Sequence, residues 1–217
     1  MLTIKCFEVN PIQENTYVVS DETKEAVIID CGTFYSQEHQ ALITYLRNEG
    51  LKLRHLLCTH GHLDHCFGNY TIYKELGVKA EVMADDEFLI TRLDEQARNM
   101  FGFELEDEVP PVGRYLSKED IIGFGHHQLT VIPTPGHTPG SCVFFCEQEQ
   151  VAFTGDTLFH LSVGRTDFER GSYLDLIKSM QLLRQTLPGT TKLYPGHGGS
   201  TTMSIELANN PYLGGSV

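Results

Sequence analysis

The first thirty residues combine apolar, β-branched stretches with polar turns, which predicts a strand-rich opening over Leu2–Asp30. Strands are expected at Thr16–Val19 and Ala26–Ile29, because both runs are rich in residues that favour a pleated backbone. The polar stretch Ser20–Glu25 between them has the composition of a turn. The chain is therefore expected to begin with an antiparallel meander.

The spacing of apolar residues then changes to that of a helix. Ser36–Asn48 carries its apolar side chains on one helical face, with Ser36 as the expected N-cap and Gly50 just beyond the end. A mostly apolar strand is expected to follow at Leu51–Cys58. The order strand, helix, strand predicts a crossover unit whose helix lies on the sheet. Residues after the second strand then fall at the edge where α/β proteins usually keep their sites.

The second half repeats this outline after a less regular stretch. Residues 85–107 have a helical but acidic pattern, and Glu104–Pro111 is expected to be a loop because of its Pro-Pro pair. Strands are then expected near 128–132, 141–146, 150–154 and 191–194, with a helix from about Ser172 to Leu187. The pattern predicts an α/β fold in which two βα halves form one sandwich, and residues 1–217 are expected to be a single domain.

The net charge of the chain argues against polyanionic binding partners. Its 217 residues include 16 Lys and Arg and 29 Asp and Glu, which gives a formal net charge of −13. The electrostatic field of this negative charge repels phosphate backbones and anionic lipids, so neither a nucleic acid nor a membrane is an expected partner. No apolar run reaches the roughly 18 residues of a membrane helix, and the first residues do not resemble a secretory signal. We therefore expect a cytoplasmic protein.

One short stretch, residues 59–65, concentrates metal-binding side chains. Directly after the strand expected at Leu51–Cys58 come His60, His62, Asp64 and His65, four potential ligands within six residues. His60 and His62 can converge on one ion, while Asp64 and His65 lie one step further and could reach a second. A polar turn with incidental histidines is the alternative, but His is usually scarce and unclustered in turns.

Three further ligand-type residues stand alone, each as the first imidazole or carboxylate after an expected strand. They are His137 in a Gly- and Pro-rich turn, Asp156 after the strand that ends at Thr154, and His197 after the strand that ends at Tyr194. Each by itself is more typical of a turn residue, but together with the first cluster they predict completed metal sites. The other histidines, at 39, 55, 126, 127 and 160, are expected at the surface or behind the ligands.

The order of these motifs resembles that of the metallo-β-lactamase superfamily. The resemblance rests on His60-x-His62-x-Asp64-His65, Gly136-His137-Thr138, Gly155-Asp156 and Gly196-His197-Gly198, which span most of the chain. It implies a four-layer αβ/βα sandwich with up to two metals at the strand ends. It also implies that His60, His62 and His137 hold one metal, that Asp64, His65 and His197 hold the other, and that Asp156 bridges them.

Within that superfamily the chain is similar to the glyoxalase II-like hydrolases, especially the short bacterial branch without a C-terminal helical domain. The likeness rests on Phe153–Phe159, Gly164–Asp167, Tyr194–Thr202 and Asn210–Leu213. Persulfide dioxygenases share the Gly-Arg-Thr-Asp string at 164–167, yet they use one iron held by the counterparts of His60, His137 and Asp156. The number of metals and the choice between hydrolysis and oxidation therefore stay open at this point.

Two cations bridged by Asp156 would lower the pKa of a shared water and polarise a substrate carbonyl. The implied activity is hydrolysis of a small hydroxyacyl-thiol, of the S-lactoylglutathione type, by a metal-bridging hydroxide that Asp64 orients. The resemblance implies two Zn²⁺ ions, with Fe or Mn as other options. A thioester suits the site because its thiolate leaves readily, whereas an amide needs a proton donor that the sequence does not reveal.

Other activities are less favoured. A Ser or Cys hydrolase lacks its G-x-S-x-G motif, and the six cysteines show no C-x-x-C spacing and are expected to be buried thiols. A β-lactamase is normally exported, and because no export signal is apparent we expect poor turnover of lactams. A nuclease needs a basic groove, which a net charge of −13 disfavours. A persulfide dioxygenase remains the alternative within the superfamily. A non-catalytic metal-binding module is the alternative outside enzymes, although none of the seven ligand positions is lost.

Two residues outside the ligand set have expected roles. The resemblance implies that Arg165 binds a carboxylate of the thiol carrier as a bidentate clamp, unless it is a structural arginine paired with Asp167 or Glu169. Asp30, at the end of the strand Ala26–Ile29, is expected to orient a ligand histidine from behind. A plain strand-end cap is the alternative for Asp30.

Overall fold

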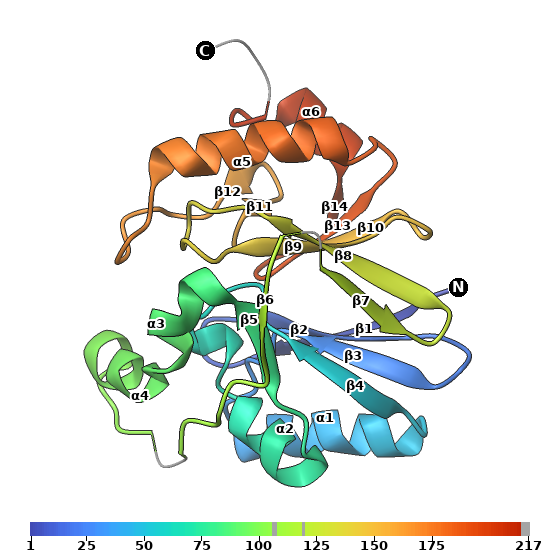
Figure 1. The fold of residues 1–217 in the computed structure, drawn as a ribbon, viewed down its shortest axis with the longest axis vertical. Coiled ribbons are helices and arrows are strands. Elements are labelled where there is room, and N and C mark those ends of the chain that lie inside the picture. The colour runs from blue at the N-terminus through green and yellow to red at the C-terminus, as the bar shows by residue number, and fades with distance from the viewer. Residues whose placement is uncertain (106–107, 119, 214–217) are drawn as a thin grey trace.

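Two six-stranded sheets form the centre of the molecule and face each other (Figure 1), in a computed structural model that describes residues 1–105, 108–118 and 120–213. The first sheet contains, in spatial order, β1 (Thr3–Val9), β2 (Glu14–Ser20), β3 (Glu25–Ile29), β4 (Lys52–Leu57), β5 (Ala80–Met83) and β6 (Arg114–Leu116). The second contains, in spatial order, β14 (Thr201–Thr202), β13 (Lys192–Pro195), β10 (Val151–Gly155), β9 (Cys142–Cys146), β8 (His127–Pro133) and β7 (Ile121–Phe124). A small ribbon of β11 (Leu158–Phe159) and β12 (Ser162–Val163) follows β10.

Helices cover the outer face of each sheet. Figure 1 shows α1 (Ser36–Asn48) and α2 (Asn69–Leu76) on the first sheet, and α5 (Tyr173–Thr186) and α6 (Met203–Asn209) on the second. The result is the four-layer αβ/βα sandwich that the sequence predicts. Among the described residues, no helix combines the length and the apolar character needed to cross a bilayer.

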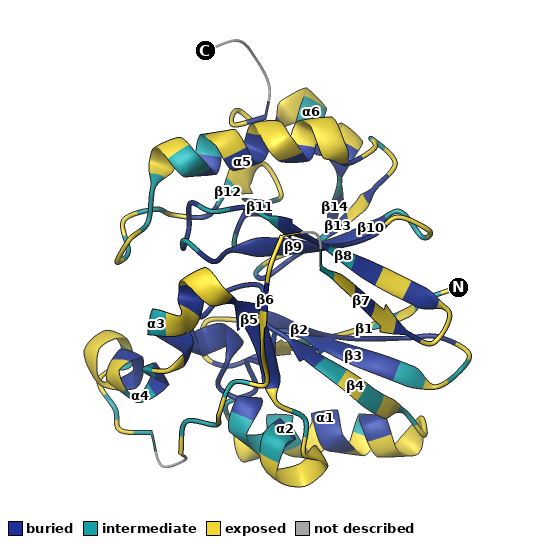
Figure 2. Cartoon of the chain, in the orientation of Figure 1, coloured by how far each residue is buried: buried dark blue, intermediate teal, exposed yellow. Residues whose placement is uncertain are grey.

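Both faces of the central strands are buried, and the alternation of their side chains explains why (Figure 2). On β3, Val27 and Ile29 point into the core between the sheets, where they join Phe144 of β9. Ala26 and Ile28 point the other way, into the core beneath α1 and α2. A strand covered on both faces has to be apolar throughout, which is how this segment appears in the sequence.

The predicted crossover is confirmed, because β3 and β4 are parallel and α1 connects them. The same arrangement recurs in the second half, where α5 connects the parallel strands β10 and β13. The expected N-cap of α1 is wrong by one residue: Tyr35 is the cap, and the Glu38 carboxylate accepts hydrogen bonds from the backbone N–H groups of Phe34 and Tyr35. Ser36 is already inside the helix.

The acidic segment with a helical pattern over 85–107 is helical as far as Phe101, but in several short turns. It consists of a 3-10 turn (Ala84–Asp86), α3 (Glu87–Ile90), α4 (Leu93–Gln96) and a π-helical turn (Ala97–Phe101). Residues 106–107 of that expectation lie outside the described residues. Asp86 and Gln96 bind backbone groups of the loop at 59–65, so this segment bends around that loop instead of forming one straight helix.

All six cysteines are free, and five of them are buried as expected. Cys6 is exposed, because it lies on β1 at the edge of the first sheet. The scattered thiols are therefore mainly part of the packing.

Candidate metal centre

The loop that follows β4 carries four of the seven expected ligand side chains. His60, His62, Asp64 and His65 are all buried, although imidazoles and carboxylates are usually exposed. A 3-10 turn over Leu63–His65 changes the direction of the chain within the loop. Because of this turn, the four side chains divide into two groups that face neighbouring points of the same cavity.

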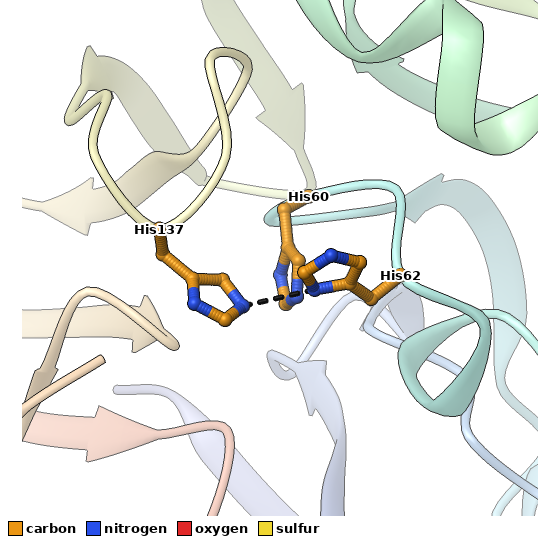
Figure 3. A group of neighbouring side chains, drawn as sticks. All are labelled: His60, His62 and His137. Atoms are coloured by element: carbon orange, nitrogen blue, oxygen red, sulfur yellow. Dashed lines mark hydrogen bonds between the residues drawn. The ribbon is translucent and has the colours of Figure 1, made fainter. Parts of the chain in front are cut away.

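The first group, which we call the first cluster, consists of His60, His62 and His137. One ring nitrogen of each residue lies within 4.8 Å of one ring nitrogen of each of the others. His62 Nδ1 and His137 Nε2 are 2.9 Å apart. Figure 3 shows the three rings pointing toward one another, His60 and His62 from the loop after β4 and His137 from the turn after β8. Three imidazole nitrogens at this spacing are a typical donor set for zinc or iron.

The second group, the second cluster, consists of Asp64, His65 and His197, whose ligand atoms also lie within 4.8 Å of one another. Asp64 Oδ2 is 3.4 Å from His65 Nε2 and 3.3 Å from His197 Nε2. His197 follows β13 of the second sheet, so this cluster joins the two halves of the sandwich.

Asp156, directly after β10, lies between the two clusters. Its Oδ1 is 3.3 Å from His65 Nε2, and its Oδ2 is 3.7 Å from His137 Nε2 and 3.8 Å from His197 Nε2. Burial alone would raise the pKa of Asp156, but the neighbouring imidazoles, His65 above all, lower it below its ordinary value. An ionised carboxylate whose oxygens face both clusters can bridge two cations.

The residues present fit a pair of metal ions. His60 Nε2, His65 Nε2 and Asp156 Oδ1 are buried and have no hydrogen-bond partner among the described residues. Buried polar atoms in folded proteins are rarely left unpaired, so these three nitrogen and oxygen atoms call for a ligand. Their chemistry, imidazole with carboxylate, is that of a site for zinc, iron or manganese.

Asp30 lies behind the second cluster and connects it to the first. Its Oδ2 accepts hydrogen bonds from His65 Nδ1 at 2.9 Å and from the Thr59 hydroxyl at 2.8 Å, and its Oδ1 accepts one from the Thr59 backbone N–H at 2.7 Å. The Thr59 hydroxyl in turn lies 3.0 Å from His60 Nδ1. A carboxylate behind a ligand imidazole fixes its tautomer and leaves the other nitrogen free to bind a metal.

The two histidines of the second half have backbone acceptors in the same position. His137 Nδ1 donates to the Arg165 carbonyl oxygen at 2.7 Å. His197 Nδ1 lies 3.2 Å from the carbonyl oxygens of both Ile12 and Gln13, in the turn between β1 and β2. Each of these rings therefore directs its Nε2 toward the centre of the site.

The two clusters differ in their affinity for protons. Burial, together with the neighbouring imidazoles, lowers the pKa of His60 well below its ordinary value and that of His62 to about 3. In the second cluster burial also works against protonation, but carboxylates, chiefly that of Asp64, raise the pKa of His65 and His197. His60 and His62 thus offer neutral imidazoles, whereas a cation in the second cluster has to displace protons.

Asp86 is a site residue that sequence reasoning missed. Its buried carboxylate accepts hydrogen bonds from the Gly61 N–H at 2.8 Å, the Gly140 N–H at 2.7 Å and the Thr138 hydroxyl at 2.7 Å. Gly61 lies between His60 and His62, while Thr138 and Gly140 follow His137, so Asp86 connects the two loops of the first cluster. In the sequence it lies in an acidic run, where nothing distinguishes it from its exposed neighbour Asp85.

Glu14 is a second such residue, fully buried behind His65. Its Oε2 accepts a hydrogen bond from the Thr16 hydroxyl at 2.8 Å, and its Oε1 is 3.9 Å from His65 Nδ1. Burial raises the pKa of Glu14 well above its ordinary value, an effect that His65 opposes and Asp30 reinforces. Glu14 follows no motif, and only the pairing of the strands brings it to the site.

A cavity of about 380 Å³ opens over both clusters and is the space in which a substrate can reach them. Arg165 lies on its rim, with its guanidinium stacked 4.5 Å from the centre of the Phe168 ring. The same guanidinium makes two hydrogen bonds of 2.6 Å to the Asp167 carboxylate. The structure therefore contains the Arg165–Asp167 pair that the sequence offered as the alternative to substrate binding.

The comparison with known families agrees with this geometry. Residues 9–201 match the family model of the metallo-beta-lactamase superfamily. This chain belongs to that superfamily. As a member, it resembles a hydroxyacylglutathione hydrolase, GloC, of Haemophilus influenzae, with 35% identity and 98% of each chain covered. It also resembles the mitochondrial persulfide dioxygenase ETHE1 of Mus musculus, with 32% identity over 88% of this chain and 67% of the relative.

Two solved structures of the superfamily are similar along nearly the whole chain. One is the B3 metallo-beta-lactamase BLEG-1, with a TM-score of 0.89, 32% identity, and 98% of this chain and 100% of that chain covered. The other is a protein crystallised in a di-iron-bound form, with a TM-score of 0.84, 31% identity, and 96% of this chain and 100% of the other covered. The superfamily thus places several activities on this fold, and the activity must be argued from the site.

Proposed function

We propose that this protein hydrolyses hydroxyacyl thioesters, of the S-lactoylglutathione type, with two metal ions. The observation that carries the proposal is the complete second cluster, in which Asp64 Oδ2 lies 3.3 Å from His197 Nε2 directly beside the first cluster. The similarity to a hydroxyacylglutathione hydrolase supports the same class of substrate. We further propose that residues 1–217 act as one domain on a small molecule, without nucleic acid, in the cytoplasm.

His60, His62 and His137 would hold one ion, Asp64, His65 and His197 the other, and Asp156 would bridge them. Zinc is the proposed metal, although the donor set also accepts iron or manganese, and a similar protein is known with two irons. When bound, the ions would supply an acidified water and an electrophile for the substrate carbonyl.

The chain's own groups would position the reactants. Asp64 is held between His65 and His197, and we propose that its carboxylate accepts a hydrogen bond from the attacking water and orients it. The water oxygen bonds to the acyl carbon, the carbon–sulfur bond breaks, and its electron pair leaves with the sulfur as a thiolate. The products are a carboxylate and a thiol, with one proton released in total.

The lining of the cavity favours a thioester over an amide. Its titratable side chains are the metal-binding residues themselves and Arg165, so none of them is a free acid that could protonate an amine. A thiolate has a conjugate acid pKa of about 8.5 and can leave without a proton donor. We therefore expect poor turnover of lactams, even though a B3 metallo-beta-lactamase shares the fold.

A persulfide dioxygenase is the second proposal, and the similarity to the murine dioxygenase favours it. The two activities separate in one experiment on metal-loaded protein. Hydrolysis of S-lactoylglutathione is followed in air and under nitrogen, and oxygen uptake is followed with glutathione persulfide. Equal hydrolysis in both atmospheres with no oxygen uptake supports the hydrolase. Rapid oxygen uptake without hydrolysis would reject it in favour of the dioxygenase.

A further inference from the structure

A second cavity, of about 250 Å³, adjoins the metal centre on the side of α3 and α4. We call it the side cavity. It shares His62, Met100 and Phe168 with the cavity over the clusters, so the two meet beside the first cluster. Figure 1 shows α3 and α4 standing at one side of the sandwich, beside the loops that follow the strands. Each cavity is near the lower end of the roughly 300–1,000 Å³ of small-molecule sites, which suits one arm of a substrate in each.

The walls of the side cavity are fixed relative to the metal centre. Gln96 Oε1 accepts a hydrogen bond from the Leu63 N–H, and Gln96 Nε2 donates to the Gly61 and Leu89 carbonyl oxygens, each at 3.0 Å. The Phe168 ring packs edge-on against His62, with 4.8 Å between ring centres. The segment that forms the cavity is therefore tied to the same loop that carries the metal ligands.

Most polar groups of the side cavity are already engaged with other groups of the protein. Arg92 donates to the Phe88 carbonyl oxygen and lies 3.5 Å from the carboxylates of both Glu95 and Glu169. The polar atoms of Gln96 are bound to the backbone, as described above, and the exposed Asn99 adds one further amide. Phe88, Leu89, Met100 and Phe168 supply carbon surface. A polar or ionised ligand group would lose water there and gain few partners, whereas an apolar group would gain from burial.

A thioester placed with its carbonyl at the metals has two arms, and both cavities have mainly apolar walls. They differ at the rim, because Arg165 of the larger cavity is 63% exposed and Arg92 of the side cavity only 38%, so a polar thiol carrier can keep its contact with water on the Arg165 side. We infer that the side cavity is the acyl subsite and selects thioesters whose acyl group carries an aryl or branched alkyl side chain over those with a methyl group. This inference rests on the proposed thioester hydrolysis and names its substrate class.

The test compares two glutathione thioesters that differ only in this side chain, S-mandeloyl with a phenyl group and S-lactoyl with a methyl group. We expect kcat/KM of the native protein to be about tenfold or more higher for the mandeloyl compound, since filling an apolar pocket is worth about 10- to 200-fold. Asn99→Trp fills the side cavity from an exposed position that does not line the larger one. It should lower the mandeloyl-to-lactoyl ratio at least about tenfold.

The matched control is Thr91→Trp, which adds the same bulk at an exposed position of the same segment outside both cavities. Its ratio should stay within about twofold of native. Phe88→Ala, which removes an apolar wall, is a second variant and should also lower the ratio. A native ratio of one or less, or a ratio that Asn99→Trp leaves unchanged, would overturn the inference.

A second test does not depend on turnover: it measures binding of the two product acids, mandelate and lactate. Mandelate should bind the metal-loaded protein more tightly than lactate by calorimetry, and Asn99→Trp should remove the difference. If neither thioester is hydrolysed, the proposed function fails, while tighter mandelate binding that is sensitive to Asn99→Trp still supports the subsite. Equal binding of the two acids in the native protein would reject it.

Discussion

The two metal clusters share one loop and one bridging residue, yet they are built differently. The first cluster consists of three buried imidazoles, and Asp86 connects its two loops by hydrogen bonds. The second includes a carboxylate and reaches the surface at His197, whose side chain is 26% exposed. Behind His197, the Nδ1 atom meets backbone carbonyls of the turn between β1 and β2 and not a carboxylate such as Asp30.

This difference shows how a single loop can supply ligand residues to two metal ions. The first cluster is held in place by hydrogen bonds to the Asp86 carboxylate, and the lowered pKa values of His60 and His62 mean that these two imidazoles need not lose protons. The second relies on the attraction between Asp64 and its histidines, so a metal has to compete with protons there. We therefore expect the first cluster to be the firmer site and the second to be the one that decides between two-metal and one-metal chemistry.

The largest effect is expected from removing a ligand of the first cluster. His62→Ala should lower thioester hydrolysis by more than about 100-fold, the upper range for loss of a residue behind a ligand, and should sharply reduce the metal content. Elemental analysis and steady-state kinetics check this. The control is His126→Ala, a histidine whose side chain is 71% exposed and far from both clusters. Full activity in metal-free protein would contradict the account.

A smaller effect is expected from the residue that connects the two loops. Asp86→Asn keeps the shape of the side chain but removes the charge that accepts hydrogen bonds from Gly61, Thr138 and Gly140. Metal affinity should fall about 10- to 100-fold, measured by competition with a chelator. Asp85→Asn, at the exposed neighbouring position, should change nothing. Unaltered metal affinity in Asp86→Asn would show that Asp86 is not what makes the first cluster the firmer metal site.

A modest effect on substrate binding is expected at the rim. Arg165 is paired with Asp167, so a substrate carboxylate gains only part of the guanidinium's hydrogen bonds. Arg165→Ala should raise KM for a glutathione thioester by about three- to tenfold and leave kcat nearly unchanged, as expected for exposed charged contacts. Arg54→Ala, which breaks a surface pair with Glu25, is the control. An unchanged KM would show that Arg165 has only a structural role and does not bind the substrate.

The smallest effect on activity is expected at Asp21, at the opposite end of the first sheet from the ligands. Burial would raise the pKa of Asp21, but hydrogen bonds from Thr23, His126 and His127 outweigh it and hold the pKa below its ordinary value of 3.8. The ionised form therefore stabilises the fold above about pH 4, and this stability is lost as the pH falls through the lowered pKa.

Asp21→Asn should lower the free energy of unfolding by about 1–3 kcal/mol at pH 7, because buried donors lose their charged acceptor. The difference from the native protein should shrink as the pH falls from about 4 through the lowered pKa of Asp21, because the unfolded chain binds the proton before the folded chain does. Urea titrations at several pH values measure it, with Glu22→Gln as an exposed control. Loss of metal in Asp21→Asn would show that the clusters depend on distant packing.

The sequence contains enough information to bring the seven expected ligand residues together, because they follow strands, and strand ends meet at one edge of each sheet. Asp156 after β10 and His197 after β13 could be found in this way. Asp86 and Glu14 could not be found in this way. Asp86 acts where one half packs on the other, Glu14 reaches the site through the pairing of strands, and neither arrangement leaves a periodic pattern in the sequence. Asp86 also explains why the helical pattern within residues 85–107 forms several short turns, since its hydrogen bonds to the loop at 59–65 bend the segment.

The fold shows the same division between local and long-range information. The β3–α1–β4 crossover follows from periodicity and turn residues, and it is confirmed. The cap of α1 was misplaced because Glu38, three residues into the helix, binds the backbone at Phe34 and Tyr35 and so fixes an earlier start. Short elements such as α6 and β14 have too few residues to show a period.

The central claim is that the second cluster is a working metal site, and His197→Ala tests it most directly. Metal equivalents per chain and S-lactoylglutathione turnover are measured for the native protein and this variant after growth with balanced zinc, iron and manganese. The account predicts two equivalents in the native protein, one in His197→Ala, and a loss of hydrolysis of at least about 100-fold. One equivalent of iron in both proteins, with oxygen uptake on a persulfide and little effect of the substitution, would contradict it.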